Sequence, residues 1–168
     1  MKIGILSDTH GHLQRTTQAI DLLASHNIDV VCHCGDLGSR AIVDALDQKF
    51  RPDEVPVHAV LGNVDHYNRA VTECCGDTGI NMLGKSGTIE LGDRRFALVH
   101  GDDRRKLAYV ITSGDFDYVL TGHTHTREDR RESRTRIINP GAVYRSAEPS
   151  VAILDLITEV ITFLELKP

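Results

Sequence analysis

Several large classes of protein are excluded by what this sequence lacks. No apolar run approaches the roughly 18 consecutive residues of a transmembrane helix, so we expect no membrane partner. The apolar run near the amino terminus, residues 3–6, is shorter than the roughly 7–15 residues of an export signal, which predicts a cytoplasmic protein. Basic residues number 19 against 24 acidic ones, a net charge of −5. This balance argues against a protein that binds nucleic acid mainly through bulk positive charge.

Tryptophan is absent and cysteine is scarce, with Cys32, Cys34, Cys74 and Cys75 only. Their C-x-C and C-C spacings differ from the C-x2-C pairs of a zinc ribbon, and we expect reduced thiols, with Cys74 and Cys75 buried as small apolar side chains. The 168 residues are 40% apolar and 26% charged, which is typical of one globular domain spanning residues 1–168. Nine histidines beside 24 carboxylates are a reason to look for a metal site.

Hydrophobic patterning predicts an α/β fold with two sheets. The first half alternates expected strands and helices, in the order strand 2–7, helix 13–26, strand 30–34, helix 41–50 and strand 55–61. This βαβαβ pattern predicts a parallel sheet flanked by helices. The second half predicts hairpins at 88–91/94–100, 126–131/135–139 and 151–156/160–166, a helix at 104–112 and a strand at 117–121. Two sheets face to face, the first covered by helices, follow from this order.

A basic stretch falls within the second of these hairpins. It contains five arginines, at positions 127, 130, 131, 134 and 136. Acidic residues alternate with them and no aromatic residue accompanies them, so we expect a solvated hairpin face rather than a nucleic-acid surface.

Polar motifs cluster where the expected strands end. They are Asp8-Thr9-His10, Gly35-Asp36, Gly62-Asn63-Val64-Asp65, His100-Gly101 and Gly122-His123-Thr124-His125. Ligands bind at the carboxyl ends of strands in α/β sheets, so these five ends can converge on one site. Chance alone gives about one D-x-H, but G-N-x-D and G-H-x-H are each expected only about 0.04 times at this composition. Residues i and i+2 of an extended segment point the same way, so paired ligands at this spacing can share a site.

In this order, the motifs D-x-H, G-D, G-N-x-D, H-G and G-H-x-H resemble the calcineurin-like metallophosphoesterase superfamily. The short length and the closing Asn139-Pro140-Gly141 resemble its small bacterial and archaeal phosphodiesterase subgroup. The resemblance spans residues 8–141 and implies a four-layer α/β/β/α sandwich of two mixed β-sheets flanked by helices. It also implies a phosphodiesterase with two divalent metal ions, in which a metal-bridging hydroxide attacks the phosphorus.

The resemblance also implies the metal ligands. Three residues would hold the first ion, namely Asp8, His10 and His125. Three others would hold the second, namely Asn63, His100 and His123, and Asp36 would bridge the pair. A ligand set of imidazole and oxygen without thiolate suits manganese first, and iron, zinc, cobalt or nickel as alternatives.

One position departs from the family pattern. Many members have a histidine that assists the leaving group where this chain has Val64, and valine cannot donate a proton. General acid–base help worth roughly 10²–10⁴-fold must come from elsewhere or be absent, and His12 and His66 are candidates by sequence proximity. We expect Asp65 to orient a neighbouring histidine.

The remaining histidines have structural interpretations. His26 is expected to cap a helix end, His33 to be packed beside the site, and His58 to lie in the sheet. Asn139-Pro140-Gly141 is either a turn or part of the site lining.

Alternatives to a phosphodiesterase remain open. A metal-dependent phosphomonoesterase would need an extra cationic contact for a dianion, and no arginine is clearly placed to supply one. A non-catalytic protein-binding scaffold on the same fold also occurs in the superfamily. The substrate is expected to be a small phosphodiester, such as a cyclic nucleotide, a dinucleotide, a glycerophosphodiester or a nucleic-acid end. Self-association through sheet edges is a further alternative.

Overall fold

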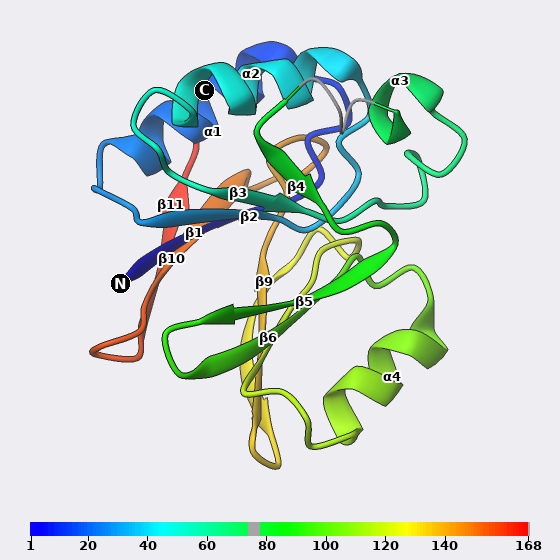
Figure 1. The fold of residues 1–168 in the computed structure, drawn as a ribbon, viewed down its shortest axis with the longest axis vertical. Helices are drawn as coiled ribbons and strands as arrows, with labels where there is room; N and C mark the ends of the chain where they lie inside the picture. The colour runs from blue at the N-terminus through cyan, green and yellow to red at the C-terminus, as the bar shows by residue number, and fades with distance from the viewer. Residues whose placement is uncertain (74–77, 168) are drawn as a thin grey trace.

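Two mixed β-sheets form the framework of the protein (Figure 1). The computed structural model describes residues 1–73 and 78–167. The first sheet contains, in spatial order, β11 (Val160–Glu165), β10 (Ser150–Asp155), β1 (Lys2–Leu6), β2 (Val30–His33), β3 (Val57–Ala59) and β4 (Ile80–Met82). The second contains β5 (Ser86–Leu91), β6 (Arg94–Val99), β7 (Tyr118–Leu120), β9 (Thr135–Pro140) and β8 (Arg127–Glu132). Both sheets combine parallel and antiparallel neighbours, which confirms the predicted fold class.

The parallel strands determine where loops can meet. β1, β2 and β3 pair in parallel, with Ile5 opposite Cys32 and Cys32 opposite His58. The helices α1 (Leu13–Ala24) and α2 (Arg40–Phe50) connect them, as the βαβαβ pattern predicts. In the second sheet β6, β7 and β9 are likewise parallel. The loops that follow β1, β2 and β3 therefore leave the same edge of the first sheet.

The layers are helix, sheet, sheet and helix. Adjacent residues of β1 show why: Ile5 packs with Phe96 between the sheets, whereas Leu6 packs on the opposite face, against α1 and α2. A third apolar cluster joins Val99 to Val110 under α4 (Arg104–Thr112). Figure 1 shows α1 and α2 over one sheet and α4 beside the other. Within residues 1–73 and 78–167, no helix is both long and apolar enough to cross a membrane.

Two short elements and several boundaries differ from the sequence prediction. β4 and the four-residue helix α3 (Arg69–Thr72) were not predicted, because such short segments show no periodicity. β3 covers three residues rather than seven, and α1 ends at Ala24, two residues before His26. Cys32 and Cys34 are buried free thiols, whereas the expectation for residues 74 and 75 lies outside the described residues.

The basic stretch forms a charge-neutralised hairpin, which we call the β8–β9 hairpin; its strand β8 is largely exposed and its strand β9 is buried. Its turn is Ser133-Arg134, one residue later than the sequence suggested. Each arginine faces a carboxylate, in the pairs Arg127–Glu165, Arg130–Glu128, Arg131–Glu159, Arg134–Asp117 and Arg136–Asp129. The expected solvated face is found on β8, whereas Arg136 on β9 is buried. No excess of positive charge is left on these arginines for a polyanion.

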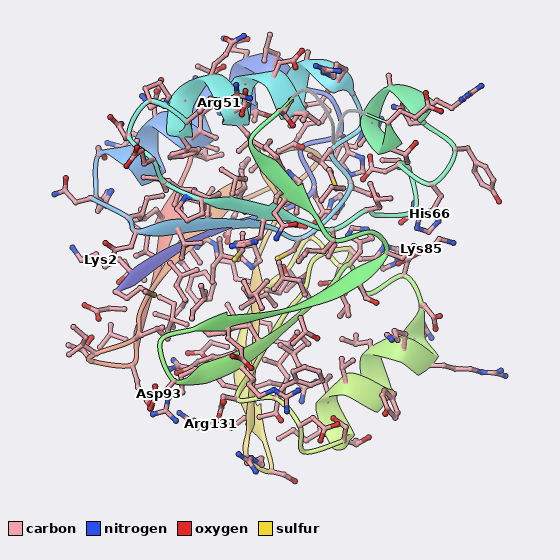
Figure 2. The ribbon with its side chains drawn as sticks, viewed as in Figure 1. Lys2, Arg51, His66, Lys85, Asp93 and Arg131 are labelled. Atoms are coloured by element: carbon pink, nitrogen blue, oxygen red, sulfur yellow. The ribbon has the colours of Figure 1, made fainter. Side chains whose placement is uncertain are left out.

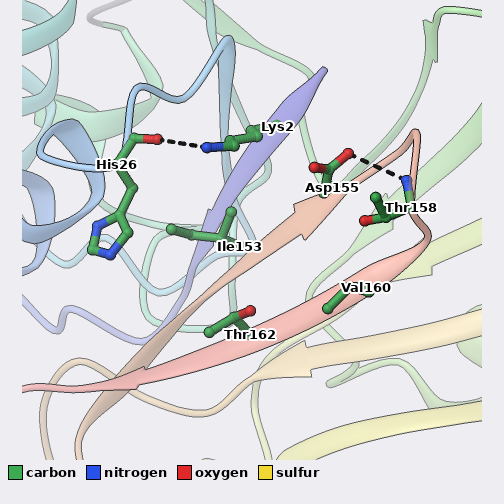
Figure 3. A pocket seen from close by; sticks show the side chains of 7 residues that line it. All are labelled: Lys2, His26, Ile153, Asp155, Thr158, Val160 and Thr162. Atoms are coloured by element: carbon green, nitrogen blue, oxygen red, sulfur yellow. Dashed lines mark hydrogen bonds between the residues drawn. The ribbon is translucent and has the colours of Figure 1, made fainter.

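A hollow of about 300 Å³ lies at the amino end of β1 (Figure 3). The Nζ atom of Lys2 donates to the carbonyl of His26 at 3.4 Å across part of it, and Asp155 accepts from the backbone of Thr158. The predicted ligand motifs follow the carboxyl ends of strands, so this hollow lies at the wrong end of β1 for the predicted chemistry.

Candidate metal centre

Five predicted ligands are gathered into one cluster by the loops after β1, β2, β6 and β7. We call it the metal-ligand cluster, and its members are Asp8, His10, Asp36, His100 and His125. Asp8, His10 and Asp36 have left-handed backbones, with φ of 57°, 47° and 57°. Such conformations are unfavourable for residues other than glycine and persist where the surrounding structure imposes them, commonly at functional sites.

The first group in this cluster is Asp8, His10 and His125, the set predicted for the first ion. The Nε2 atom of His125 lies 3.1 Å from Oδ1 of Asp8 and 3.3 Å from Nε2 of His10. The Nε2 atom of His10 lies 3.9 Å from the same Asp8 oxygen. One carboxylate oxygen and two imidazole nitrogens thus converge on one point, as ligands of a single cation do.

The second group is Asp8, Asp36 and His100. The Nε2 atom of His100 lies 3.4 Å from Oδ2 of Asp36, and Nε2 of His10 lies 3.8 Å from that same oxygen. Asp36 therefore touches both groups, in agreement with a bridging position. Asp8 belongs to both groups as well, which the sequence assignment did not include.

Asn63 and His123 adjoin the second group. The His123 ring lies edge-on to the His100 ring with 5.1 Å between centroids, and its backbone N–H donates to Oδ2 of Asp8 at 3.1 Å. Asn63 precedes Val64, whose N–H donates to Oδ1 of Asp36 at 3.0 Å. It follows Gly62, where any Cβ would collide with the Asp36 carboxylate, so only glycine allows this approach. His123 therefore lies beside the cluster but outside both ligand groups, and Asn63 is placed near it by its chain neighbours Gly62 and Val64.

Two buried atoms of the cluster fit a cation. Oδ1 of Asp8 and Nε2 of His100 are buried and have no hydrogen-bond partner within the described part of the chain. A buried acceptor without a donor is unfavourable by roughly 1–3 kcal/mol, and more for a charged group. Both are good metal ligands, and the set of carboxylates and imidazoles suits a first-row divalent ion. The residues present therefore fit the metal site that the motifs predict.

Backbone carbonyls orient two of the imidazole rings. Nδ1 of His100 donates to the carbonyl of Cys34 at 2.8 Å, and Nδ1 of His125 donates to the carbonyl of Arg145 at 3.0 Å. With the proton on Nδ1, each neutral ring presents an unprotonated Nε2 to the cluster. This is the tautomer that a metal ligand requires.

The carboxylates set the electrostatics of the cluster. Burial would raise the pKa of Asp36, but His100 and the Val64 N–H lower it below its usual value. Burial would lower the pKa of His100, but the Asp36 carboxylate raises it above its usual value. The Asp36 carboxylate and the His100 imidazole thus stabilise each other's charged forms, so a bound cation would compete with a proton for Nε2 of His100.

Asp65 does not orient a histidine, contrary to the prediction from sequence. Its buried carboxylate accepts backbone N–H groups from Leu37 at 3.0 Å, Gly38 at 2.8 Å and Gly62 at 2.9 Å. These donors belong to the loops that carry Asp36 and Asn63. Asp65 is therefore a positioning residue that ties the two ligand loops together.

His33 has a similar bracing position. It is fully buried, its Nδ1 accepts from the N–H of Gly35 at 3.2 Å, and its Nε2 lies 3.1 Å from Oγ1 of Thr9. Burial lowers the pKa of His33 to about 3, so the ring is neutral and Nε2–H donates to Thr9. The expected packed position is correct, and the ring joins the loops after β1 and β2.

Asn139 resolves the two interpretations of its motif. Its side-chain Nδ2 donates to the carbonyl of Gly122 at 2.8 Å and to Oγ1 of Thr124 at 3.0 Å, and its Oδ1 accepts from Gly141. Asn139 lies at the end of strand β9 rather than in a turn, and its side chain holds the loop that carries His123 and His125.

The two candidate proton donors lie outside both ligand groups. Nδ1 of His12 accepts from the N–H of Arg15 at 3.3 Å and caps α1, while its ring packs on Tyr144 at 4.2 Å between centroids. His66 is half-buried on the side of the molecule where α3 lies, opposite Lys2 (Figure 2).

The other histidines behave as expected. His26 follows the carboxyl end of α1, where its Nδ1 lies 2.8 Å from the carbonyl of Leu22. His58 lies in β3 and contacts Asn81 of β4 at 3.0 Å. Neither belongs to the metal-ligand cluster.

Sequence reasoning missed Arg145. No arginine had a clear place near the site, yet the carbonyl of Arg145 binds the cluster residue His125, and its charge contributes to the lowered pKa of His10. The available signal was proximity to Asn139-Pro140-Gly141, which Arg145 follows by four residues.

The fold and the cluster define a two-sheet α/β protein whose candidate metal ligands lie at the ends of the strands. A model of the calcineurin-like phosphoesterase superfamily domain matches residues 1–159. The chain belongs to this superfamily, and it is an enzyme of the phosphoesterase class.

Similar proteins cover nearly the whole chain. A phosphodiesterase of Methanocaldococcus jannaschii is 34% identical over 158 residues, which cover 92% of this chain and 93% of that protein. A solved structure of a novel archaeal phosphodiesterase has a TM-score of 0.85 at 30% identity and covers 99% of this chain and 100% of that one. Vps29 of Entamoeba histolytica complexed with zinc has a TM-score of 0.61 at 19% identity, covering 99% and 100%. This last likeness concerns the fold alone.

Proposed function

We propose that this chain is a phosphodiesterase that uses two divalent metal ions. The observation that carries the proposal is the pair of ligand groups that share Asp8 and lie side by side with buried, unpartnered atoms. The similarity to two archaeal phosphodiesterases supports the same reaction class. Manganese is our first choice of metal, with iron, zinc, cobalt and nickel as alternatives of the same ligand preference.

The proposed ligands follow the sequence assignment. The first site comprises Asp8, His10 and His125, the second comprises Asn63, His100 and His123, and Asp36 lies between them. When bound, two such ions supply positive charge for the phosphoryl oxygens and lower the pKa of coordinated water. The protein contributes two carboxylates, imidazoles held in the ligating tautomer, and loops fixed by Asp65 and Asn139.

The leaving group receives little help from the chain. Val64 occupies the position of the proton-donating histidine and is 39% exposed. His12 and His66 remain the proposed donors, and neither belongs to a ligand group. We therefore predict that diesters with p-nitrophenyl leaving groups, which need no proton, react at least about 10²-fold faster than alkyl diesters. Equal rate constants for the two would contradict this.

A metal and substrate panel tests the main proposal. Protein stripped with chelator and reloaded with manganese, nickel, cobalt, zinc or magnesium is assayed with a diester and a monoester of the same alcohol. We expect hydrolysis of the diester and uptake of two ions per chain in elemental analysis. Uptake of no more than one ion would exclude the dinuclear site, and failure to cleave any diester with any metal would exclude the phosphodiesterase.

One observation favours the phosphomonoesterase as a second candidate. A dianionic monoester needs an additional cation, and Arg145 lies next to the metal-ligand cluster. The protein-binding scaffold has no comparable support, because all seven predicted ligands are present in this chain.

A further inference from the structure

Arg145 is held in a fixed position at the rim of the metal-ligand cluster. Its carbonyl accepts from Nδ1 of His125 at 3.0 Å, and its backbone is left-handed with φ of 58°. An arginine adopts this conformation only where other contacts outweigh its unfavourable energy. The bond to a predicted metal ligand provides such a contact, so the positions of Arg145 and His125 are linked.

The loop before Arg145 is joined to the segment that carries Asp8. The N–H of Val143 donates to the carbonyl of Ser7 at 3.0 Å, and the N–H of Tyr144 donates to the carbonyl of Asp8 at 3.2 Å. The Arg145 guanidinium lies 6.0 Å from the centroid of the Tyr144 ring, which itself packs on His12. A cation at this distance is attracted by the aromatic ring, and this restricts the directions that the arginine side chain takes.

The guanidinium of Arg145 is exposed and its internal contact is with an aromatic ring rather than with a carboxylate. Throughout the described ranges no carboxylate forms an ion pair with it, whereas every arginine of the β8–β9 hairpin has one. The Arg145 main chain lies within hydrogen-bond distance of the predicted ligand His125, so the cluster is within the reach of its long side chain. Its five N–H donors remain available to an anion.

Space for a small substrate adjoins this loop. A hollow of about 340 Å³ begins at the predicted ligand His125 and continues along the residues after Arg145; its lining is His125, Thr126, Arg127, Ser146, Ala147 and Glu148. A molecule in this hollow would contact the cluster residue His125 and the residues that follow Arg145 in the chain.

We propose that Arg145 binds the substrate by donating hydrogen bonds to non-bridging oxygens of its phosphate group. The proposal rests on the phosphoesterase function proposed above and adds a specificity determinant to it. A phosphomonoester dianion carries one more charge and one more terminal oxygen than a diester. The guanidinium therefore contributes more to binding a terminal phosphate, and it extends the substrate class of the site toward monoesters.

Binding of inorganic phosphate tests the contact without turnover. Manganese-loaded wild type, Arg145→Gln, Arg145→Lys and the control Arg134→Gln are titrated with phosphate in a calorimeter, and their metal content is measured. Arg134 is an exposed arginine in the turn of the β8–β9 hairpin. We expect Arg145→Gln to weaken phosphate binding about 10-fold or more, Arg145→Lys to recover part of the loss, and the control to match wild type. Metal content stays constant, because the bond to His125 uses the main chain.

Kinetics then measure specificity. We expect Arg145→Gln to lower kcat/KM for p-nitrophenyl phosphate about 10-fold more than for methyl p-nitrophenyl phosphate, mainly through KM. Unchanged phosphate affinity, or loss of metal together with phosphate, would overturn the proposal. If wild type hydrolyses no ester but its phosphate binding still depends on Arg145, the proposed function fails and the contact stands.

Discussion

The β8–β9 hairpin and the metal-ligand cluster are both dense in ionisable side chains, but they neutralise charge differently. On the hairpin each arginine lies against a carboxylate, as in the bidentate pair of the buried Arg136 and the partly exposed Asp129 at 2.7 and 2.8 Å. In the cluster the carboxylates of Asp8 and Asp36 are buried, and no lysine or arginine pairs with either one among the described residues.

This difference separates a structural charge network from a functional one. Every arginine of the hairpin already has a carboxylate, so the hairpin needs no ligand to neutralise its charge. Exposed ion pairs of this kind contribute little free energy of folding. Buried carboxylates without a counter-ion are unfavourable until a cation binds. The number of charges in a region is therefore less informative than whether the protein itself satisfies them.

The largest expected effect comes from removing one carboxylate in each region. Asp8→Asn should lower kcat/KM for a diester by on the order of 10³-fold or more, because Asp8 belongs to both ligand groups. Loss of a residue that only supports a metal ligand already lowers metal affinity or activity about 10–100-fold, so loss of a ligand should cost more. The matched variant Asp129→Asn should change kcat/KM less than about 2-fold. Steady-state kinetics and elemental analysis measure both.

The two variants also differ in stability without metal. Asp8→Asn removes an unpaired buried charge, so the chelator-treated variant should be at least as stable as chelator-treated wild type in urea unfolding. Equal activity of the Asp8 and Asp129 variants would show that the cluster has no more chemical importance than the hairpin.

A smaller loss is expected when the cluster remains but its support is removed. Asp65→Asn replaces the carboxylate that accepts three backbone N–H groups, so metal affinity or activity should fall about 10–100-fold and the free energy of unfolding by about 1–3 kcal/mol. Metal titration followed by urea unfolding separates these two effects. A variant with full metal affinity and normal stability would mean that the two ligand loops hold their positions without Asp65.

The ligands were predictable because each one follows a strand within a short motif. G-N-x-D and G-H-x-H carry their spacing locally, and the βαβαβ order places their strands in one sheet. β4 was not predictable in the same way, because three residues are too few to show a hydrophobic period. It is a strand only because it pairs with β3.

The roles of Asp65 and Arg145 depend on contacts that sequence does not display. Asp65 accepts from Leu37 and Gly38, 28 and 27 residues away, and this pairing exists only after the loops after β2 and β3 meet. Arg145 resembles any other exposed arginine until the fold shows that His125 binds its carbonyl and that no carboxylate pairs with it along the described chain. Predicting the ligands needed only local order, whereas predicting their supports needed the packed structure.

The smallest expected effect concerns the hairpin pair. The Arg136 guanidinium lowers the pKa of Asp129 below its usual value, so the pair stabilises the folded state above the ordinary aspartate pKa, and this contribution is lost as pH falls through the lowered pKa. Because the Asp129 carboxylate is partly exposed, although Arg136 is largely buried, a double-mutant cycle with Asp129→Asn and Arg136→Gln should give a coupling of only about 0.5–1 kcal/mol at pH 7. Urea unfolding at pH 7 and near pH 3 measures it, and we expect the coupling to shrink at the lower pH. A coupling of several kcal/mol would show that the hairpin holds its charges as tightly as a buried site, and the contrast with the metal-ligand cluster would then no longer separate structure from function.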